Sequence, residues 1–443
     1  MFRSRRAAAV VMGSMLLAGM ALTPATVAQT PTDLSLWVFV DRHGQFMVKQ
    51  AEAWNAANPD RPINLTYENI DYTQMHDNLL AAFLAGQGAP DLVDIEIGKF
   101  ARFVKTEDNV HLLDLTAEVA PYLPDLVATR MAPYQAYGKQ LGIDYHLGAY
   151  LMYYNQALLT EAGIDADAIK TWDDYVAAGK AFKEKFPDKA WTAVESRSIF
   201  SAYGLMYQNG GHVYDADGNL VLNSPENAEA LQFMSDLVNV DKIAIEAPAG
   251  DINSVEFQAE FPNGNIASIW MPQWYMTRFP DNMPTLCGSM IVRPMPLWEE
   301  GGFTTTMGGG TGTAVTDQTP AEEQALAKEF LAFAKLTNDA QNALWNDLGF
   351  DPYRNDVYDE AALSETDTPD VADWPASNPC FNGAVTFQQI KAELGNVAPE
   401  YTGPLYPEAR TILSEQIMPS IINDGRPAAE ALAEAQSLTE AQQ

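Results

Sequence analysis

The sequence predicts an α/β protein in which apolar strands alternate with amphipathic helices. Residues 34–95 have the pattern strand, helix, strand, helix, strand, and a similar alternation returns between residues 140 and 209. The composition, 47% hydrophobic and 19% charged over 443 residues, is that of a globular chain. Such alternation is typical of parallel sheets covered by helices. A chain of this length usually forms about two or three domains.

The first unit begins with the apolar run at residues 34–40, which predicts a buried strand. Phe46, Gln50 and Trp54 follow at helical spacing, and the Asn-Pro-Asp at 58–60 ends that helix. Three further elements are then expected, namely an alternating strand at 63–67, a helix at 71–85 that ends at glycine, and a strand at 91–95.

The second unit repeats this order. Residues 140–155 are strand-like, a helix is expected from Thr171 through Phe186, and a strand at 191–195 precedes a helix at 198–209. The Asp-Ala-Asp-Gly-Asn at 215–219 has acidic residues spaced as in a calcium loop. Its glycine comes too early for an EF-hand, so a hairpin turn is favoured.

The remaining chain is mostly helical. Ser224-Pro225 predicts a helix start, and the Thr-Pro-Ala-Glu at 319–322 predicts a capping box before a helix through Lys335. The residues after Ser437 are expected to fray. Helix breaks are expected at Gly349, at residues 369–379 and at residues 403–404.

The N-terminus has the pattern of a secretory signal peptide. Arg3, Arg5 and Arg6 precede an apolar stretch at 7–22, and the Thr-Val-Ala at 26–28 offers small residues to a signal peptidase. We expect residues 1–28 to be removed and the mature protein to be exported, into a bacterial periplasm. An uncleaved membrane anchor is the alternative, which the short apolar stretch and the cleavage site behind it disfavour.

Charge and cysteine content narrow the classes of partner. With 26 Lys and Arg against 59 Asp and Glu, the net charge of −33 disfavours nucleic acid and anionic membranes as partners. It also disfavours an anionic small ligand unless a local basic pocket overrides it. Cys287 and Cys380 form a disulfide in an oxidising compartment if they lie close together; otherwise Cys287 is a small buried apolar residue.

Signatures of catalysis and of metal binding are missing from the sequence. It contains no Gly-x-Ser-x-Gly, Ser-x-x-Lys or Walker motif. None of the five histidines is paired at i, i+4 or stands beside a cysteine, which disfavours a metal site and leaves no cofactor predicted. A pair of carboxylates for glycoside cleavage stays open as an alternative, because 59 acidic residues are available.

Polar and aromatic clusters follow several predicted strands. They lie at residues 41–45, 94–96, 144–146, 270–275 and 308–312. In an open parallel sheet, ligands bind beyond the carboxyl ends of the strands. Aromatic rings stack on sugar rings, while carboxylates, amides and imidazoles exchange hydrogen bonds with sugar hydroxyls.

Each cluster also has a structural interpretation. Trp270 extends an apolar strand and is expected in the core, whereas Trp274, beyond the Pro-Gln break, is the better stacking candidate. His146 is either a core histidine or a ligand contact, and Arg354 has the alternative role of holding its loop. Two further tryptophans on helix faces are expected to be structural, namely Trp172 and Trp345.

Several segments in this order resemble the extracellular solute-binding proteins of bacterial ABC sugar importers. They are the signal peptide, Gly-Ala-Pro-Asp-Leu at 88–92, Ala-Gly-Ile at 162–164 before Thr-Trp-Asp-Asp-Tyr at 171–175, Asn-Gly-Gly at 209–211 and Gly-Gly-Thr-Gly at 309–312. Three more segments resemble the arabino-oligosaccharide-binding branch, at residues 74–79, 298–302 and 344–352.

The resemblance implies a two-lobed periplasmic-binding-protein fold with a hinge, each lobe a sheet flanked by helices. Lobe 1 would comprise residues 33–143 plus 299–345 and lobe 2 residues 148–296 plus 350–436, with crossings near 144–147, 296 and 349. The protein would be a monomer that binds a neutral pentose or short oligosaccharide, arabinose-containing in this branch. It would deliver the sugar, unaltered, to a membrane permease driven by a separate ATPase.

The resemblance also implies a set of ligand-binding residues in the loops between the lobes. The candidates are His43, Glu96, Tyr145, His146, Glu195, Trp274, Tyr275, Gly310, Thr311 and Arg354. A secreted glycoside hydrolase is the alternative of a different class, and a metal- or polyamine-binding relative is a third interpretation.

Overall fold

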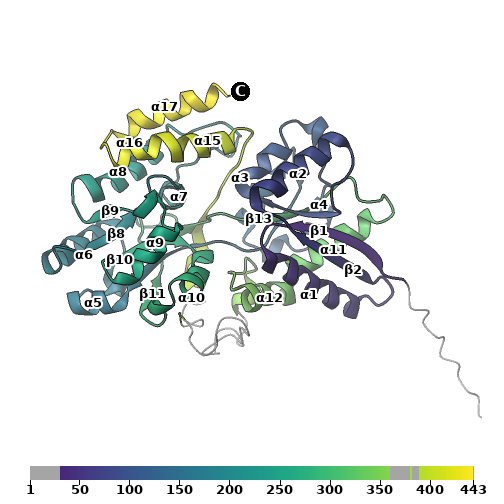
Figure 1. Ribbon diagram of the computed structural model, residues 1–443, viewed down its shortest axis with the longest axis horizontal. Helices are drawn as coiled ribbons and strands as arrows, with labels where there is room; N and C mark the ends of the chain where they lie inside the picture. The colour runs from purple at the N-terminus through teal and green to yellow at the C-terminus, as the bar shows by residue number, and fades with distance from the viewer. Residues whose placement is uncertain (1–29, 360–379, 382–388, 443) are drawn as a thin grey trace, which may run out of the picture.

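The computed structural model describes residues 30–359, 380–381 and 389–442 and contains two α/β halves side by side (Figure 1). The predicted signal peptide and the expected helix break at 369–379 lie outside the described residues. Within the described residues, no helix is both long and apolar enough to span a membrane.

The first half contains a five-stranded sheet in the order β2-β1-β3-β13-β6. β1 (Thr32–Val38) pairs in parallel with both β2 (Ile63–Asn69) and β3 (Leu92–Glu96), which confirms the predicted parallel layer. The late strand β13 (Thr311–Val315) enters this sheet antiparallel to β3 and to β6 (Ile143–Asp144). Two segments far apart in sequence therefore meet next to the end of β3.

Helices cover both faces of the first sheet because its strand residues alternate between two apolar clusters. α1 (Asp41–Ala57) and α11 (Gln324–Leu336) pack on one face, where the ring edge of Trp54 meets Phe330. α2 (Tyr72–Ala85) packs on the other face. Each parallel crossover thus begins with a helix directly after a strand end.

The second half contains the sheet β11-β7-β10-β8-β9. β8 (Ala190–Val194) pairs in parallel with β9 (Ala244–Glu246) and β10 (Ile266–Pro272), whereas β7 (Tyr150–Asn155) runs antiparallel to β10 and β11 (Met290–Arg293). Every residue of β7, β8 and β10 is buried, as expected for strands covered on both faces.

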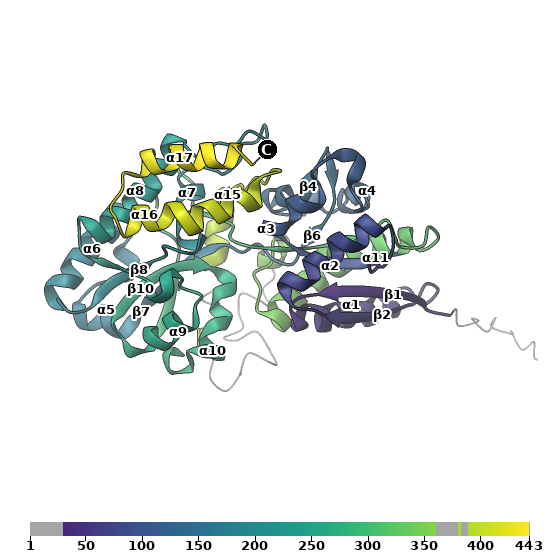
Figure 2. The same cartoon turned by 45° about the horizontal axis from the view of Figure 1, so that its top comes forward.

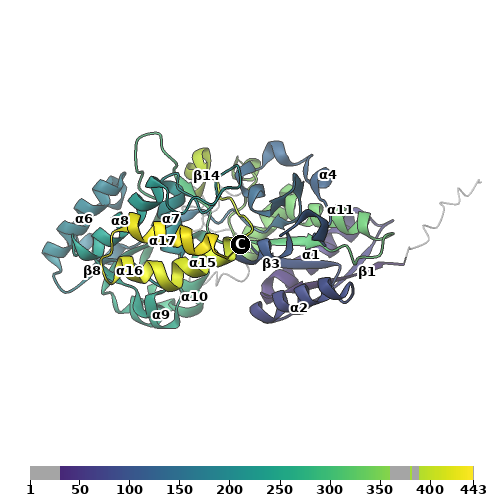
Figure 3. The same ribbon diagram turned by 90° about the horizontal axis from the view of Figure 1, so that it is seen from above.

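Helices surround this second sheet, and their order along the chain shows how the half is built. Between β7 and β11 the chain forms α5 (Gln156–Ala162), α6 (Trp172–Lys185), α7 (Phe200–Gln208), α8 (Pro225–Asn239), α9 (Val255–Glu260) and α10 (Arg278–Asn282). The C-terminal helices α15 (Tyr406–Ile412), α16 (Met418–Ile422) and α17 (Ala428–Glu440) lie along the same half, in yellow in Figures 2 and 3. α15 extends toward the middle of the molecule.

Local sequence signals set several helix ends. Thr171 and Asp174 form a capping box at α6, and the Ser224 hydroxyl accepts a hydrogen bond from the amide of Asn227 at α8. Residues 215–219 form the expected turn, closed by a β-bridge between Tyr214 and Leu220. The predicted helix starts at Thr171 and at Ser224 and the predicted turn at 215–219 are confirmed.

Two predictions at helix ends are wrong. The helix after Pro320 begins only at Gln324, and the Thr319 hydroxyl donates to the carbonyl of Asp91 in place of capping it. α17 stays helical to Glu440 because Thr439 is buried and its hydroxyl donates to the carbonyl of Ala435.

Three segments run between the halves and are hydrogen-bonded side by side. Leu147 donates its amide to the carbonyl of Asp351 (3.0 Å), and Gly308 donates its amide to the carbonyl of Gly148 (2.9 Å). β12 (Thr305–Thr306), which precedes Gly308 in the chain, contacts the second half, because Thr305 Oγ1 donates to the carbonyl of Tyr150. The residue ranges of the two lobes remain a prediction.

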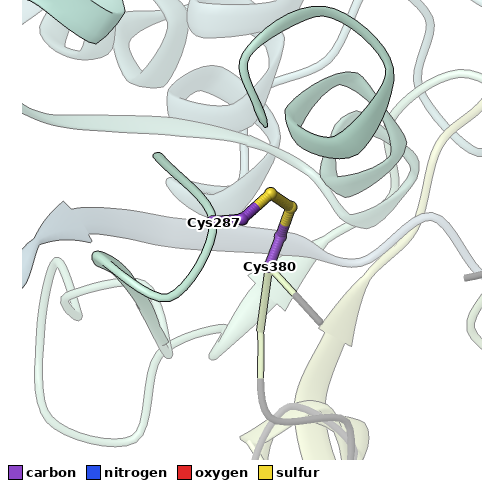
Figure 4. Close-up of a disulfide and its surroundings, with 2 residues drawn as sticks. All are labelled: Cys287 and Cys380. Atoms are coloured by element: carbon purple, nitrogen blue, oxygen red, sulfur yellow. A yellow bond between two sulfur atoms is a disulfide. The ribbon is translucent and has the colours of Figure 1, made fainter. Parts of the chain in front are cut away.

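Cys287 and Cys380 form a disulfide, which decides between the two interpretations left open by the sequence (Figure 4). The amide of Gly288 also donates to the carbonyl of Cys380 (3.1 Å). The bond fastens a segment from late in the chain beside the turn that leads into β11.

Candidate functional site

A cavity of about 740 Å³ has walls from both halves of the molecule. From the first half it is lined by the loops that follow β1 and β3 and by the start of α2, in residues Phe39, Arg42, His43, Tyr72 and Glu96. The second half contributes Phe200 at the start of α7, Asn253 just before α9, Trp274 after β10, Arg278 and Asp281 of α10, and Arg410 of α15. The crossing segments supply His146, Gly309, Gly310, Thr311 and Phe350.

Six of the ten predicted site residues line this cavity, namely His43, Glu96, His146, Trp274, Gly310 and Thr311. The reason is topological. The parallel strands β1 and β3 end at one sheet edge, and Thr311 pairs directly with Glu96 across β13 and β3.

The other four lie outside the cavity wall. Tyr275 is buried and its hydroxyl donates to the carbonyl of Ile252 (2.8 Å). Arg354 holds its loop, as the alternative interpretation had it, through Asp356 and Asp125. The remaining two, Tyr145 and Glu195, are buried directly behind residues that face the cavity or its rim.

Glu195 is a fully buried carboxyl at the end of β8. It accepts hydrogen bonds from the amides of Ser201 (2.6 Å) and Ile252 (3.2 Å). Desolvation by burial, with the nearby charge of Asp251, raises its pKa to about 8. Its backbone bonds fasten the start of α7, so Glu195 supports the cavity wall that carries Phe200.

Two imidazoles face the cavity, and each is held by a buried carboxylate. His43 Nδ1 lies 3.0 Å from Asp94 Oδ2, and His146 Nδ1 lies 3.2 Å from Asp351 Oδ1. Burial lowers the pKa of His43, and this outweighs the hydrogen bond and charge of Asp94, which raise it. Phe350 contacts both rings, with centroids 5.9 Å from His43 and 4.4 Å from His146. His146 is therefore both well packed and part of the cavity wall.

Trp274 and Phe200 form an aromatic corner on the opposite wall. The indole N–H of Trp274 donates to the carbonyl of Gly308 (2.9 Å), and the Phe200 ring stands nearly perpendicular to it at 5.1 Å. Trp270 is fully buried in the core, as predicted, and so are the helix-face tryptophans Trp172 and Trp345. The Pro-Gln break after β10 is what turns Trp274 out of the core.

The charged side chains of the cavity have mixed signs. Glu96 accepts hydrogen bonds from Arg410 Nη1 (3.0 Å) and from the hydroxyl of Tyr72 (2.9 Å), so a bond between the halves closes one side. Arg278 Nε donates to Asn253 Oδ1 (2.9 Å), and burial lowers the pKa of Arg278. Such a mixture offers both donors and acceptors without a dominant charge, which suits an uncharged polar ligand.

The buried ion pair of Arg130 and Asp144 shapes the glycine loop, residues 308–312. Arg130 donates to the carboxylate of Asp144 and to the carbonyl of Gly309 (2.9 Å). Asp144 also accepts the amides of Tyr145 (2.7 Å) and Thr311 (3.3 Å). Gly310 has a φ of +148°, and a Cβ there would overlap the Arg130 guanidinium. Glycine is thus required for the chain to pass this ion pair and reach the cavity.

Several lining residues were missed by sequence reasoning. Phe39 lies two residues before Asp41, the first residue of the 41–45 cluster, and could have been included in it. Tyr72, Phe200 and Phe350 lie at the starts of helices or in loops, where aromatic residues carry no distinctive pattern. Arg410 comes from α15, more than 300 residues after its partner Glu96, and no local signal points to it.

In residues 30–359, 380–381 and 389–442, no group of three or more His, Cys, Asp or Glu is placed to hold a metal ion.

Comparison with known proteins gives consistent matches. Residues 41–341 match the family model for bacterial extracellular solute-binding protein. The chain is 44% identical over 334 residues to an arabinooligosaccharide-binding protein of Halalkalibacterium halodurans, covering 75% of this chain and 74% of that protein. It is 39% identical over 352 residues to an arabinooligosaccharide-binding protein of Bacillus subtilis, covering 80% of each.

Solved structures share the fold. The crystal structure of the cyclic alpha-maltosyl-1,6-maltose binding protein from Arthrobacter globiformis superimposes with a TM-score of 0.74 at 20% identity, covering 93% of this chain and 99% of that one.

Proposed function

The chain belongs to the bacterial extracellular solute-binding protein family, and from this premise we propose that it captures an arabino-oligosaccharide as the binding component of an ABC importer. As a solute-binding protein it holds its ligand without converting it. The curated relatives at 44% and 39% identity support the class of sugar.

The observation that carries the proposal is the cavity whose walls come from both halves. Its volume of about 740 Å³ falls within the range of small-molecule sites, roughly 300–1,000 Å³. Trp274 and Phe200 offer apolar surface for the C–H face of a sugar ring. The two imidazoles, together with the Gly309–Gly310 backbone next to Trp274, supply hydrogen-bonding groups for hydroxyls.

Ligand capture follows from this placement. We assign lobe 1 to residues 33–143 plus 299–345 and lobe 2 to residues 148–296 plus 350–436, except that β12 (Thr305–Thr306) packs on lobe 2. Bending then occurs at the three crossing segments, near residues 147, 308 and 351. A sugar that contacts both walls stabilises the closed arrangement over the open one, and closure removes water from the hydrogen bonds. The loaded protein then delivers the sugar to a membrane permease. We place it as a monomer in the periplasm, after cleavage behind Ala28.

Titration calorimetry tests the proposal with arabinobiose, arabinotriose, maltotriose and free arabinose. We expect the arabino-oligosaccharides to bind most tightly and to leave no new reducing ends after prolonged incubation. Trp274→Ala should weaken binding by more than about 1 kcal/mol if the indole packs on the sugar. The matched control is Tyr137→Ala, which removes an exposed aromatic side chain outside the cavity. Absence of binding by every sugar in the panel would refute the proposal.

A further inference from the structure

His43 is held by a carboxylate whose other contacts are also donors. Asp94 is buried and accepts hydrogen bonds from the hydroxyls of Thr313 (2.6 Å) and Tyr145 (3.1 Å) in addition to its contact with His43 Nδ1. The Tyr145 ring stacks on the imidazole with centroids 4.1 Å apart, which fixes the plane of the ring. A carboxylate surrounded by donors acts as an acceptor, so the hydrogen of His43 lies on Nδ1.

His146 is held in the same way by a carboxylate from another segment. Asp351 Oδ1 accepts the amide of Gly148 (2.9 Å), and Oδ2 accepts the amide of Ala149 (2.8 Å). Backbone amides only donate, so Asp351 is an acceptor toward all of its partners. The hydrogen of His146 therefore also lies on Nδ1.

The opposite ring nitrogens are consequently bare acceptors. Neither His43 Nε2 nor His146 Nε2 has a hydrogen-bond partner among the residues that the structure describes, and neither is a fully buried atom left unpaired. Both rings line the same cavity and contact the same Phe350 ring. The cavity wall thus presents two neighbouring nitrogens that can only accept a hydrogen bond. Hydroxyl and amide side chains, by contrast, can both donate to and accept from a sugar hydroxyl.

We propose that Asp94 and Asp351 are positioning residues that hold His43 and His146 as hydrogen-bond acceptors, so that the site selects a sugar end that donates two free hydroxyl hydrogens. This inference rests on the proposed function and specifies the part of the ligand that the two histidines recognise, namely a pair of free hydroxyl groups. Sugars whose hydroxyls at this end are methylated or absent leave the acceptors unpaired and are discriminated against.

A pH dependence follows, because a protonated imidazole has no acceptor. Burial keeps the pKa of His43 below its usual value, so the ring is neutral at neutral pH and affinity falls on acidification. Three charged or titratable groups act on His43, since Asp94 raises its pKa, whereas Lys335 of α11 and the neighbouring His146 lower it. The other titratable and charged groups near the imidazoles are Tyr72, Tyr145, Asp144, Asp351, Arg42, Glu96, Arg278, Asp281 and Arg410.

Nitrogen NMR of the free protein tests the tautomers directly. With ring ¹⁵N-labelled histidine and each signal assigned by a His→Gln variant, His43 and His146 should show hydrogen on Nδ1 only. His111 pairs with Asp317 on the surface in the same way (Nδ1 to Oδ2, 2.8 Å) and serves as the reference signal. Hydrogen on Nε2 of either cavity histidine would overturn the proposal.

Calorimetry with arabinotriose and its fully O-methylated form, from pH 5 to pH 8, tests the selection. For the wild type we expect the methylated sugar to bind at least about tenfold more weakly, and arabinotriose to lose affinity toward pH 5. Asp94→Asn should weaken arabinotriose binding about tenfold at pH 7.5. It should also move the acid loss to lower pH, because the variant lacks the charge that raises the pKa of His43.

Further variants keep the test independent of any one that fails to fold. His43→Gln retains an amide oxygen as acceptor, so it should bind at pH 7.5 with a flatter pH profile. Asp351→Asn should repeat the loss through His146. Asp317→Asn is the matched control and should change neither affinity nor pH profile.

The outcomes separate the two proposals. If arabinotriose binds but its affinity is flat across pH, is unchanged in Asp94→Asn and equals that of the methylated sugar, the selection is refuted and the proposed function stands. If no sugar of the panel binds at any pH, the proposed function fails and the selection fails with it.

Discussion

Arg130→Met tests how much the buried ion pair contributes to the molecule. Arg130 and Asp144 are both buried, and among the described residues the guanidinium is the only cation within ion-pair distance of the carboxylate, with Lys335 interacting at longer range. Losing one partner of such a pair costs about 3–5 kcal/mol, because the other charge stays buried without compensation. Asp144 keeps three amide donors, and the methionine removes two buried Arg130 nitrogens, Nε and Nη1, that have no partner in the described chain. Both effects place the expected loss near the lower end, about 3 kcal/mol.

Urea unfolding followed by tryptophan fluorescence measures this loss, and calorimetry measures the sugar affinity of the folded variant. Affinity should also fall, because Arg130 fixes the Gly309 carbonyl at the cavity. Asp144→Asn in the Arg130→Met background removes the stranded charge and should recover part of the stability. A loss below about 1 kcal/mol in the single variant, or a further loss in the double variant, would refute the reasoning.

Three other predictions concern stability. Burial raises the pKa of Glu195 from 4.5 to about 8, so the folded state binds this proton more tightly than the unfolded chain does. The resulting contribution to the free energy of unfolding is fully present below pH 4.5 and is lost as the pH rises through 8. Glu195→Gln should therefore flatten the decline in the free energy of unfolding that urea unfolding measures at pH 5, 7 and 9. Replacing Cys287 and Cys380 together by serine opens a loop that spans 93 residues and should cost about 4–5 kcal/mol in the same assay, with sugar affinity kept. Gly310→Ala should cost at least about 2 kcal/mol, since φ is +148° and the Cβ would overlap Arg130.

Each of these has a result that contradicts it. A Glu195→Gln profile parallel to the wild type would show that the carboxyl is charged in the folded state. If the wild type has the same free energy of unfolding with and without reductant, the disulfide does not contribute the predicted stability. A Gly310→Ala variant with wild-type stability would mean that the loop shifts freely, in conflict with its bond to the ion pair.

The strand and helix order was predictable because each element carries its own periodicity and end signals. Asp71 and Gly86 bound α2 through local hydrogen bonds and a left-handed residue, which sequence alone indicates. The capping box at Thr319 failed because its hydroxyl finds the Asp91 carbonyl, an acceptor more than 200 residues away. Local rules are accurate only where no distant partner competes.

The candidate site shows the same contrast between residues that local patterns indicate and residues that only distant packing brings into place. The candidates His43, Glu96 and Thr311 line the cavity because strand ends meet at one edge of the first sheet. Tyr275 was misplaced because it stands next to Trp274 in the same turn, and only the packing decides which of two adjacent aromatics faces outward. Arg410 was missed for a related reason, since α15 reaches the cavity only through the packing of the C-terminal helices.

The hydrogen bonds between the three crossing segments constrain how the halves move. Gly148 lies between its two neighbours, bonded on one side to the amide of Gly308 and on the other to the carboxylate of Asp351. Three crossing segments without bonds between them would let the halves twist and slide against each other. Segments that are hydrogen-bonded side by side bend together, about one common axis. In the closure that we propose, these bonds restrict the halves to nearly one path, so that the two walls meet in the same relative position each time a ligand binds.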